Sequence, residues 1–179
     1  MPATPADLFA MLDRLGIAHA TVEHPALFTV DQSQALRGQI PGGHTKNLFL
    51  KDKKGALFLV VALEDAVIKL GSLHRQLGAS GRFSFGSPEL LSEVLGVEPG
   101  SVTPFAAMND TAGRVSLVLD AAMMRCATLN YHPLANTMTT SIARDDLLKF
   151  LRATGHEPRV EPVSEPADGA GTAHGPATT

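Results

Sequence analysis

Two apolar segments on either side of a short polar turn constrain the fold of this chain most strongly. Residues 46–51 and 56–63 are rich in leucine, valine and phenylalanine, and the residues between them are Asp52, Lys53, Lys54 and Gly55. Apolar runs of this length around a polar, glycine-containing turn are typical of two antiparallel strands. We therefore expect a β-hairpin over residues 46–63.

Helix and strand patterns alternate along the rest of the chain. Leu8, Met11, Leu12 and Leu15 recur at helical spacing, and Thr4 precedes them as an N-cap. Similar patterns predict helices over residues 31–36, 64–77, 87–95 and 144–151, and strands over residues 21–24, 83–85, 115–119, 127–131 and 137–142. This mixture indicates an α+β fold.

The length and composition suit one folded domain. The chain has 179 residues, of which 44% are hydrophobic and 18% charged, which is ordinary for a globular core. After Gly155 the sequence becomes rich in proline and glycine, so we expect a domain over residues 1–156 and a disordered tail over residues 157–179. The apolar run at residues 56–63 is far shorter than the roughly 20 residues of a membrane span. We expect a cytoplasmic protein without membrane contact.

Several functional classes are disfavoured by the composition. Cys126 is the single cysteine and lies in an apolar turn, which favours a buried, inert thiol. The seven histidines form no metal-ligand pattern, so we expect neither a metal nor another cofactor. The net charge of −3 and the lack of a helix-turn-helix pattern argue against sequence-specific DNA binding.

A small cluster of lysines stands out in this chain of negative net charge. Lys46, Lys51, Lys53 and Lys54 fall within nine positions, with Asp52 as the one opposing charge. Taken alone, the cluster is better explained as a solvated hairpin turn than as a binding patch, although contact with the end of a nucleic acid stays open.

Three short motifs place polar side chains beside apolar runs. Glycine at the start of the second motif and proline at its end would fix an irregular turn whose free N–H groups hold a ligand oxygen. We expect the three motifs to form one pocket from distant loops. They are His44-Thr45-Lys46-Asn47, Gly100-Ser101-Val102-Thr103-Pro104 and Leu129-Asn130-Tyr131-His132-Pro133.

The order of these motifs resembles that of the YbaK/prolyl-tRNA synthetase editing-domain superfamily. The resemblance covers residues 4–154, and the sequence around Lys46 is most similar to that of the freestanding prolyl-tRNA deacylases called ProXp-ala or PrdX. It implies a single domain with a curved, mostly antiparallel mixed sheet flanked by helices. It also implies hydrolysis of alanine wrongly esterified to a proline tRNA, with the tRNA acceptor end as partner. A transient contact with a synthetase stays open.

The resemblance assigns catalytic roles to four residues. Lys46 would hold the terminal phosphate or ribose and orient the ester; the alternative is a solvated surface lysine. His132 would bind the substrate amine, the adenosine or an ordered water, and an ordinary pKa near 6.5 also permits proton transfer. A structural histidine is the competing interpretation. The Gly100 and Ser101 amides would hold the ester carbonyl or the attacking water, unless this loop is a simple connection.

The resemblance also indicates five substrate-binding residues. Asn47 would hydrogen-bond the ribose or the amino group, or else cap a turn at a strand edge. Pro104 completes the loop motif. Asp120 orients the pocket from its floor or caps the following helix, and we favour the cap. Thr29 and Ser141 would line the pocket.

An aminoacyl ester is already electrophilic, so an editing enzyme needs mainly to position water and stabilise the developing negative charge. This agrees with a chain that has no Gly-x-Ser-x-Gly motif and no paired carboxylates. Two alternatives stay open. One is the same chemistry on another small ester such as Cys-tRNA(Pro), and the other is a noncatalytic tRNA- or synthetase-binding module.

Overall fold

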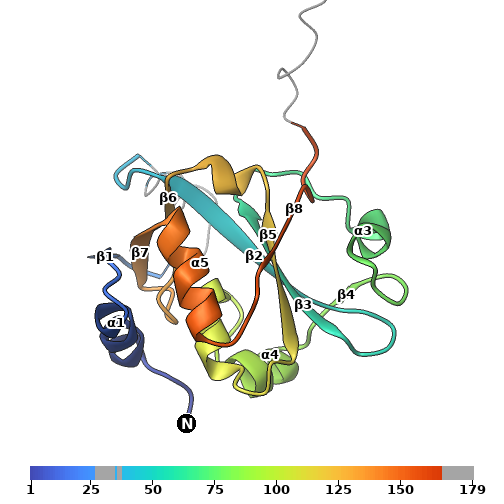
Figure 1. Ribbon diagram of the computed structural model, residues 1–179, viewed down its shortest axis with the longest axis horizontal. Coiled ribbons are helices and arrows are strands. Elements are labelled where there is room, and N and C mark those ends of the chain that lie inside the picture. Colours follow the sequence, from blue (N-terminus) through green and yellow to red (C-terminus); the bar gives the residue numbers. More distant parts are fainter. Residues whose placement is uncertain (27–34, 36–37, 167–179) are drawn as a thin grey trace, which may run out of the picture.

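The structure is a computed structural model that describes residues 1–26, 35 and 38–166 (Figure 1). In this part of the chain the helices are α1 (Pro5–Arg14), α3 (Leu70–Leu77), α4 (Pro88–Leu95) and α5 (Arg144–Ala153), with 3₁₀ turns η1 (Pro104–Asn109) and η2 (Met123–Arg125). The strands are β1 (His19–Glu23), β2 (Gly43–Lys51), β3 (Leu57–Leu63), β4 (Ser84–Phe85), β5 (Val115–Asp120), β6 (Thr128–Tyr131), β7 (Met138–Ala143) and β8 (Arg159–Glu161).

Within the described residues, the strands form one mixed sheet. Its order is β1–β7–β6–β2–β3–β5–β8, and β4 pairs with the end of β2. Antiparallel pairing joins β1 to β7, β6 to β7, and β2 to both β3 and β4. The β2–β6, β3–β5 and β5–β8 pairs are parallel. The prediction of an α+β fold around a mostly antiparallel mixed sheet is confirmed.

The expected hairpin is the centre of this sheet. β2 and β3 pair antiparallel from Thr45 opposite Leu63 to Lys51 opposite Leu57. The helix predicted over residues 5–15 is also confirmed as α1, because the Thr4 hydroxyl accepts from the Asp7 amide and the Asp7 carboxylate accepts from the Thr4 amide.

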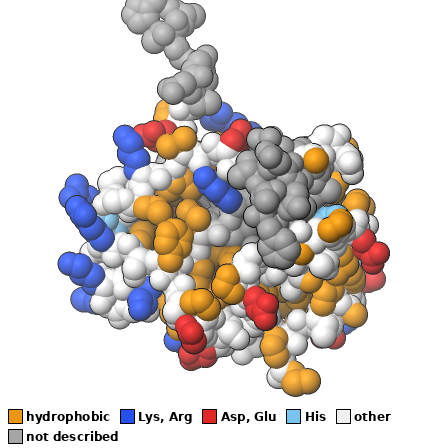
Figure 2. Space-filling view, turned by 180° about the vertical axis from the view of Figure 1, so that it is seen from behind, with side chains coloured by type: hydrophobic (Ala, Val, Ile, Leu, Met, Phe, Trp, Pro, Cys, Tyr) orange, Lys and Arg blue, Asp and Glu red, His pale blue; other side chains and the backbone are white. Residues whose placement is uncertain are grey.

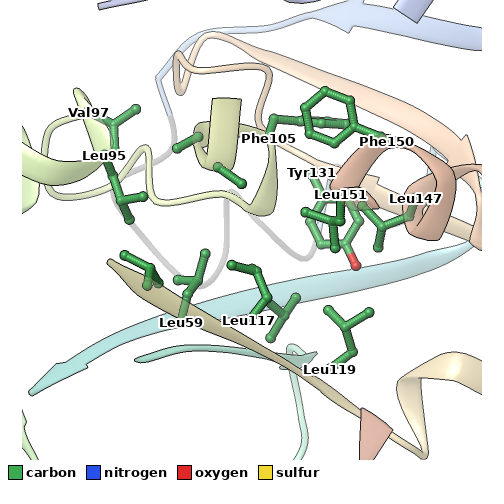
Figure 3. Packing of buried hydrophobic residues seen from close by; sticks show 14 of the residues in the cluster. Leu59, Leu95, Val97, Phe105, Leu117, Leu119, Tyr131, Leu147, Phe150 and Leu151 are labelled. Carbon is green, nitrogen blue, oxygen red and sulfur yellow. The ribbon is translucent and has the colours of Figure 1, made fainter. Parts of the chain in front are cut away.

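The core divides into two clusters because side chains alternate along β3. Leu59 and Val61 point to the main cluster, which α1, α4, η1 and α5 cover, whereas Val60 points to a second cluster under α3. Figure 3 shows the aromatic part of the main cluster, where Phe105 meets both Tyr131 and Phe150 edge-on at ring-centroid distances of 5.8 and 5.4 Å. Each fully buried side chain of this size contributes about 1.5–3 kcal/mol.

The predicted helix over residues 64–77 is too long, since α3 begins only at Leu70. The preceding segment, residues 64–69, is called the Ala66 loop below. Its backbone groups bond to distant partners: Glu64 N–H donates to His44 O, and Val67 O accepts from Glu165 N–H. These contacts compete with the bonds of a helix. The helix predicted over residues 31–36 falls almost wholly outside the described residues.

The prediction that disorder begins at residue 157 is wrong for residues 157–166. β8 pairs with β5, and Val163 is buried in the second cluster. We call residues 159–165 the C-terminal strap. Its one short strand lies between Pro158 and Pro162, so the composition indicated disorder although the segment has a place in the sheet. Residues 167–179 lie outside the described residues. None of the described helices is long and apolar enough to cross a membrane.

Candidate active site

β2 and β6 diverge in a fork, and two of the predicted catalytic residues follow it along the chain, Lys46 on β2 and His132 directly after β6. The strands pair only through Gly43 with Leu129 and His44 with Asn130, although both continue further. At the point of separation the Thr45 hydroxyl donates to the Asn130 carbonyl at 2.7 Å. Lys46 follows two residues after the paired His44 on β2, and His132 follows directly after the end of β6 at Tyr131. The fork therefore joins the first and third motifs.

Asn130 fixes the closed end of this fork. Its side chain is buried, and the amide nitrogen donates to the carbonyls of Pro41 and Gly43 at 3.0 and 3.3 Å. Its side-chain oxygen accepts a hydrogen bond from the Ser141 hydroxyl. Asn130 thus ties the start of β2 to β6 and β7. Ser141, predicted to line the pocket, instead supports Asn130.

His132 is held as a neutral imidazole. Its Nδ1 lies 2.9 Å from the Met138 carbonyl, which can only accept, so Nδ1 carries the proton. In the neutral ring Nε2 then carries a lone pair, and no described residue bonds to it. Burial lowers the pKa of His132 and the nearby His24 lowers it further, whereas the bond to Met138 opposes them. At neutral pH the ring is therefore a hydrogen-bond acceptor at Nε2.

Lys46 and Asn47 lie on opposite faces of β2. Lys46 is half-buried, and its ammonium group donates to the Ala66 carbonyl, which leaves further donors on the same nitrogen. Asn47 pairs with Val61 inside the hairpin, so it does not cap a turn at a strand edge. Its Oδ1 atom is buried without a partner among the described residues. A buried, unpaired acceptor costs about 1–3 kcal/mol, so Asn47 Oδ1 would gain from a donor.

The loop of the second motif lies against the connection that follows His132. A Cβ atom placed on Gly100 would lie 3.7 Å from the Asn136 side chain, between β6 and β7. Gly100 has a φ of +90°, and the Ser101 amide donates to Glu98 O at 3.0 Å, which together form a type II turn. The Ser101 amide is therefore already bonded within the turn, contrary to the expectation that it holds a substrate oxygen. Pro104 is buried and begins η1.

Strained backbone follows His132. Leu134 has a φ of +68°, in the left-handed region that residues other than glycine rarely adopt. Its side chain packs against the main cluster, which holds the backbone in place. Such strain is often found at functional sites, where surrounding packing sustains it.

Asp120 neither lines the fork nor caps a helix. Its Oδ1 accepts from the amides of Val163 and Ser164 in the strap, and its Oδ2 has no partner among the described residues. The favoured interpretation as a cap is wrong, because Ala122 occupies the N-cap position of η2 without a side-chain bond. The Asp120 carboxylate instead holds the C-terminal strap by these hydrogen bonds. Thr29 lies outside the described residues.

Two hollows open near the fork. One of about 670 Å³ lies at the end where β2 and β6 begin, and its lining includes Gly43, His44 and Cys126. Cys126 is thus half-buried beside a hollow and not enclosed in the core as expected. The other, of about 430 Å³, is lined by Glu23, His24, Thr137 and Met138. In the part of the chain that the structure describes, no three His, Cys, Asp or Glu residues cluster as metal ligands would.

Sequence reasoning missed Asn130 and His24 as parts of the site. Asn130 stands within a quoted motif, but its partners come from residues 41–43 and from β7, which only the fold brings together. The His24 ring lies 6.2 Å from the His132 ring, across a sequence separation that no local pattern reports.

The class of this mixed α+β domain follows from comparison with known families. The aminoacyl-tRNA editing domain matches residues 24–150, and the chain belongs to this family. The resemblance stated from the motifs is therefore confirmed.

Two relatives show which members of this family the chain is similar to. The chain is 40% identical over 154 residues to prolyl-tRNA synthetase associated domain-containing protein 1 of Danio rerio, an alignment that covers 85% of this chain and 83% of that protein. It is 32% identical over 150 residues to the prolyl-tRNA editing protein ProX of Acetoanaerobium sticklandii, covering 83% and 91% of the two chains.

Solved structures show the same fold. A candidate trans-editing enzyme for prolyl tRNA synthetase superposes with a TM-score of 0.67 at 20% identity, covering 92% of this chain and 99% of that one. The hypothetical protein APE2540 gives a TM-score of 0.70 at 18% identity, covering 88% and 99%.

Proposed function

We propose that this protein is a trans-editing deacylase that hydrolyses mischarged Ala-tRNA(Pro). The support is its place in the aminoacyl-tRNA editing family and its similarity to a prolyl-tRNA editing protein and to prolyl-tRNA synthetase associated proteins. The tRNA acceptor end carrying a small amino acid is then the partner, and synthetase contact during delivery is compatible with the relatives' names.

The observation that carries the proposal is that the two segments leaving the fork each carry a group suited to ester hydrolysis, an accepting Nε2 on His132 and a donating ammonium on Lys46. A neutral His132 Nε2 accepts a hydrogen bond from a water or from the substrate amine. The Lys46 ammonium supplies positive charge for a phosphate, a ribose oxygen or the developing oxyanion. No protein nucleophile is needed, because the ester is already activated and attack by a positioned water suffices. Cys126 lies at the other end of β6, away from His132.

A second surface is suited to the RNA strand. Lys53, Lys54, Arg75 and Arg82 are exposed along the β2–β3 turn and the segment from α3 to β4. Figure 2 shows Lys and Arg side chains gathered along this edge of the molecule. Phosphate contacts there would add affinity and make it depend on salt. The fork would then bind the esterified amino acid, while the basic side chains of this edge bind the phosphates of the tRNA.

Selection of alanine over proline would rest on size. The two side chains differ by two carbons, and a methylene is worth roughly 1–3 kcal/mol in an apolar pocket. A hydrolytic site that excludes the larger ring rejects the correct product by steric overlap, at a cost of about 1–3 kcal/mol or more. We therefore expect alanyl and other small esters to be cleaved and prolyl esters to be spared.

Deacylation of proline tRNA carrying alanine, serine, cysteine or proline tests the proposal. We expect fastest loss of alanine and no loss of proline, and Lys46→Ala should slow the reaction by about a hundredfold or more. Lys53→Ala is the matched control, because it removes a lysine outside the fork and should weaken binding without abolishing hydrolysis.

Other outcomes would identify the alternatives. Faster release of cysteine would make the cysteinyl ester the substrate. Equal rates for alanine and proline would remove the size sieve. A wild-type protein that binds the tRNA but hydrolyses none of the four esters would favour a noncatalytic binding module.

A further inference from the structure

The His132 ring lies against a second imidazole whose position is fixed independently. The His24 and His132 ring centroids are 6.2 Å apart with an interplanar angle of 55°. This distance is within the range at which aromatic rings contact each other. His24 precedes Pro25 at the end of β1, and its amide donates to the Thr137 carbonyl at 2.9 Å. The backbone of His24 is thus anchored to the entrance of β7.

Both nitrogens of the His24 ring are bonded. Nδ1 lies 2.8 Å from the Pro25 carbonyl, which can only accept, so Nδ1 carries a proton. In the neutral ring Nε2 must then accept from the Thr139 hydroxyl, also at 2.8 Å. Two bonds at opposite sides of the ring prevent it from turning. Thr139 is itself buried in β7, so the whole arrangement is built into the sheet.

The His132 ring has only one such bond among the described residues, from Nδ1 to Met138 O. A ring held at one atom can still flip or swing about its Cβ–Cγ bond. The His24 ring lies beside it, with the two ring centroids 6.2 Å apart. A fixed neighbour at this distance would limit how far the His132 ring can swing and so favour the orientation with Nδ1–H on Met138 and the lone pair on Nε2.

We propose that His24 is a positioning residue for His132, locked by Thr139 and Pro25 so that the His132 ring keeps one orientation and one tautomer during deacylation. This inference rests on the proposed function. His24 acts through His132 and does not itself have to contact the substrate. The charged group that lines the same hollow as His24 is Glu23 on β1.

Two conservative substitutions test this role. Thr139→Val removes the hydroxyl that fixes His24 and keeps the side-chain volume, and His24→Gln removes the ring. Thr140→Val is the matched control: Thr140 is the next residue of β7, is equally buried, and shares a hydrogen bond of the same 2.8 Å length with the Thr21 hydroxyl. It follows Thr139 in the strand and so points to the opposite face of the sheet, where its hydroxyl bonds to Thr21 and not to His24.

Nitrogen-15 NMR of the His132 ring gives a readout that does not depend on activity. We expect the wild type and Thr140→Val to show one Nδ1–H tautomer. In Thr139→Val and His24→Gln we expect a mixture of tautomers, and in His24→Gln also a higher pKa of His132, since a neighbouring imidazole that disfavours its protonation is gone. Single-turnover deacylation of Ala-tRNA(Pro) should slow by up to about a hundredfold at saturating enzyme, with little change in the enzyme concentration that half-saturates the reaction.

The two readouts separate failure of this inference from failure of the function. Unchanged His132 signals in both His24→Gln and Thr139→Val would overturn the positioning role whatever the activity. Altered signals with an unchanged rate would overturn it too, as would an equal rate loss in Thr140→Val. Absence of deacylation by the wild type would instead contradict the proposed function, and the NMR comparison would still report whether His24 orders His132.

Discussion

Asn130 shows how one buried side chain can set the geometry of a site that it does not enter. Its amide group links three segments that are distant in sequence: residues 41–43, β6 and β7. Gly42 and Gly43 pack so closely here that a Cβ atom on either would lie within 3 Å of a neighbouring atom. Close backbone approach and a four-group hydrogen-bond network together fix where β2 begins, and hence where Lys46 lies.

We expect Asn130→Leu to destabilise the protein and to lower its activity. The leucine keeps the branching of the side chain but leaves the Pro41 and Gly43 carbonyls and the Ser141 hydroxyl without their partner, at a cost of about 1–3 kcal/mol. Urea unfolding monitored by circular dichroism measures the change. Ser141→Ala removes only one of these bonds and should cost less. An Asn130→Leu variant as stable as wild type would show that water replaces the lost partners.

At the residue scale, chemistry was predictable from the sequence and its exact use was not. Lys46 and His132 could be named because they stand beside apolar runs in motifs that resemble those of the editing superfamily, and their catalytic roles stay predictions. The bonds of Ser101 and Asp120 could not, because they depend on which neighbours the fold supplies: Glu98 for the Ser101 amide, and the strap for the Asp120 carboxylate. The role of Asn47 in substrate binding stays a prediction, and its unpaired Oδ1 depends on burial, which the sequence does not show.

At the scale of elements, the β2–β3 turn is more than a solvated connection. Asp52 is buried, and its carboxylate accepts from the amides of Lys54 and Ala56 within the turn and of Ser80 beyond α3, each at 2.9 Å. Lys53 N–H also donates to Ser80 O. One carboxylate thus binds the hairpin to the α3–β4 segment, where the basic edge continues.

Asp52 should make part of the stability depend on pH. The Ser80 amide, followed by those of Ala56, Lys54 and Gly55, lowers the pKa of Asp52 below its ordinary 3.8, while burial opposes them. A lowered carboxyl pKa gives stability that is fully present above the unfolded-state value and is lost as the pH falls through the folded-state value. In urea titrations from neutral pH downward, the gap between wild type and Asp52→Asn should therefore narrow below about pH 4.

Asp145→Asn provides the control for this titration, because the Asp145 side chain is 83% exposed and pairs only with Arg144. Its midpoint should follow that of the wild type at every pH. If the gap between Asp52→Asn and the wild type stays constant down to acid pH, the carboxylate charge is not what holds the turn.

Helices and strands whose turns or caps lie within a few residues of them in the sequence were predicted well. Elements whose bounds depend on hydrogen bonds to distant residues were not. The hairpin and α1 each carry their own turn or cap within a few residues, so periodicity sufficed. The start of α3 depends on the Ala66 loop. The backbone of this loop bonds to His44, about twenty residues earlier in the chain, and to Glu165, about a hundred residues later. β8 has only three residues, too few for a period-2 pattern to be visible.

At the scale of the whole molecule, the parallel pairs determine where the fork forms. β2–β6, β3–β5 and β5–β8 each join strands separated by long stretches of chain. Such pairs cannot be predicted from a turn motif, because parallel strands are joined by a long crossover connection and not by a hairpin turn. That the three motifs share one pocket stays a prediction, and the motifs gave no sign that β2 and β6 would diverge between the first and the third.

The same topology connects the C-terminal strap to Lys46. Val163 fills the second cluster, and Glu165 N–H donates to Val67 O at 2.8 Å in the Ala66 loop. The neighbouring carbonyl in that loop, on Ala66, accepts from the Lys46 ammonium. The strap thus holds the loop that in turn holds the lysine of the fork.

We expect a chain that ends after Pro158 to be less stable and less active than one that ends after Pro166. The shorter chain loses the burial of Val163, worth about 1.5–3 kcal/mol, together with the β5–β8 pairing. The longer chain keeps every described contact of the strap and is the control. Urea unfolding midpoints measure the loss, and equal midpoints for the two chains would exclude a stabilising role for residues 159–166.

Glu165→Pro isolates the link to Lys46 within the full chain. Proline removes the N–H that donates to Val67 O, whereas Glu165→Ala keeps it and removes only the exposed ion pair with Lys69, which contributes little. Deacylation of Ala-tRNA(Pro) should therefore slow in Glu165→Pro and stay near the wild-type rate in Glu165→Ala, both measured well below their unfolding temperatures. Equal rates in the two variants would mean that the Ala66 loop holds Lys46 without help from the strap.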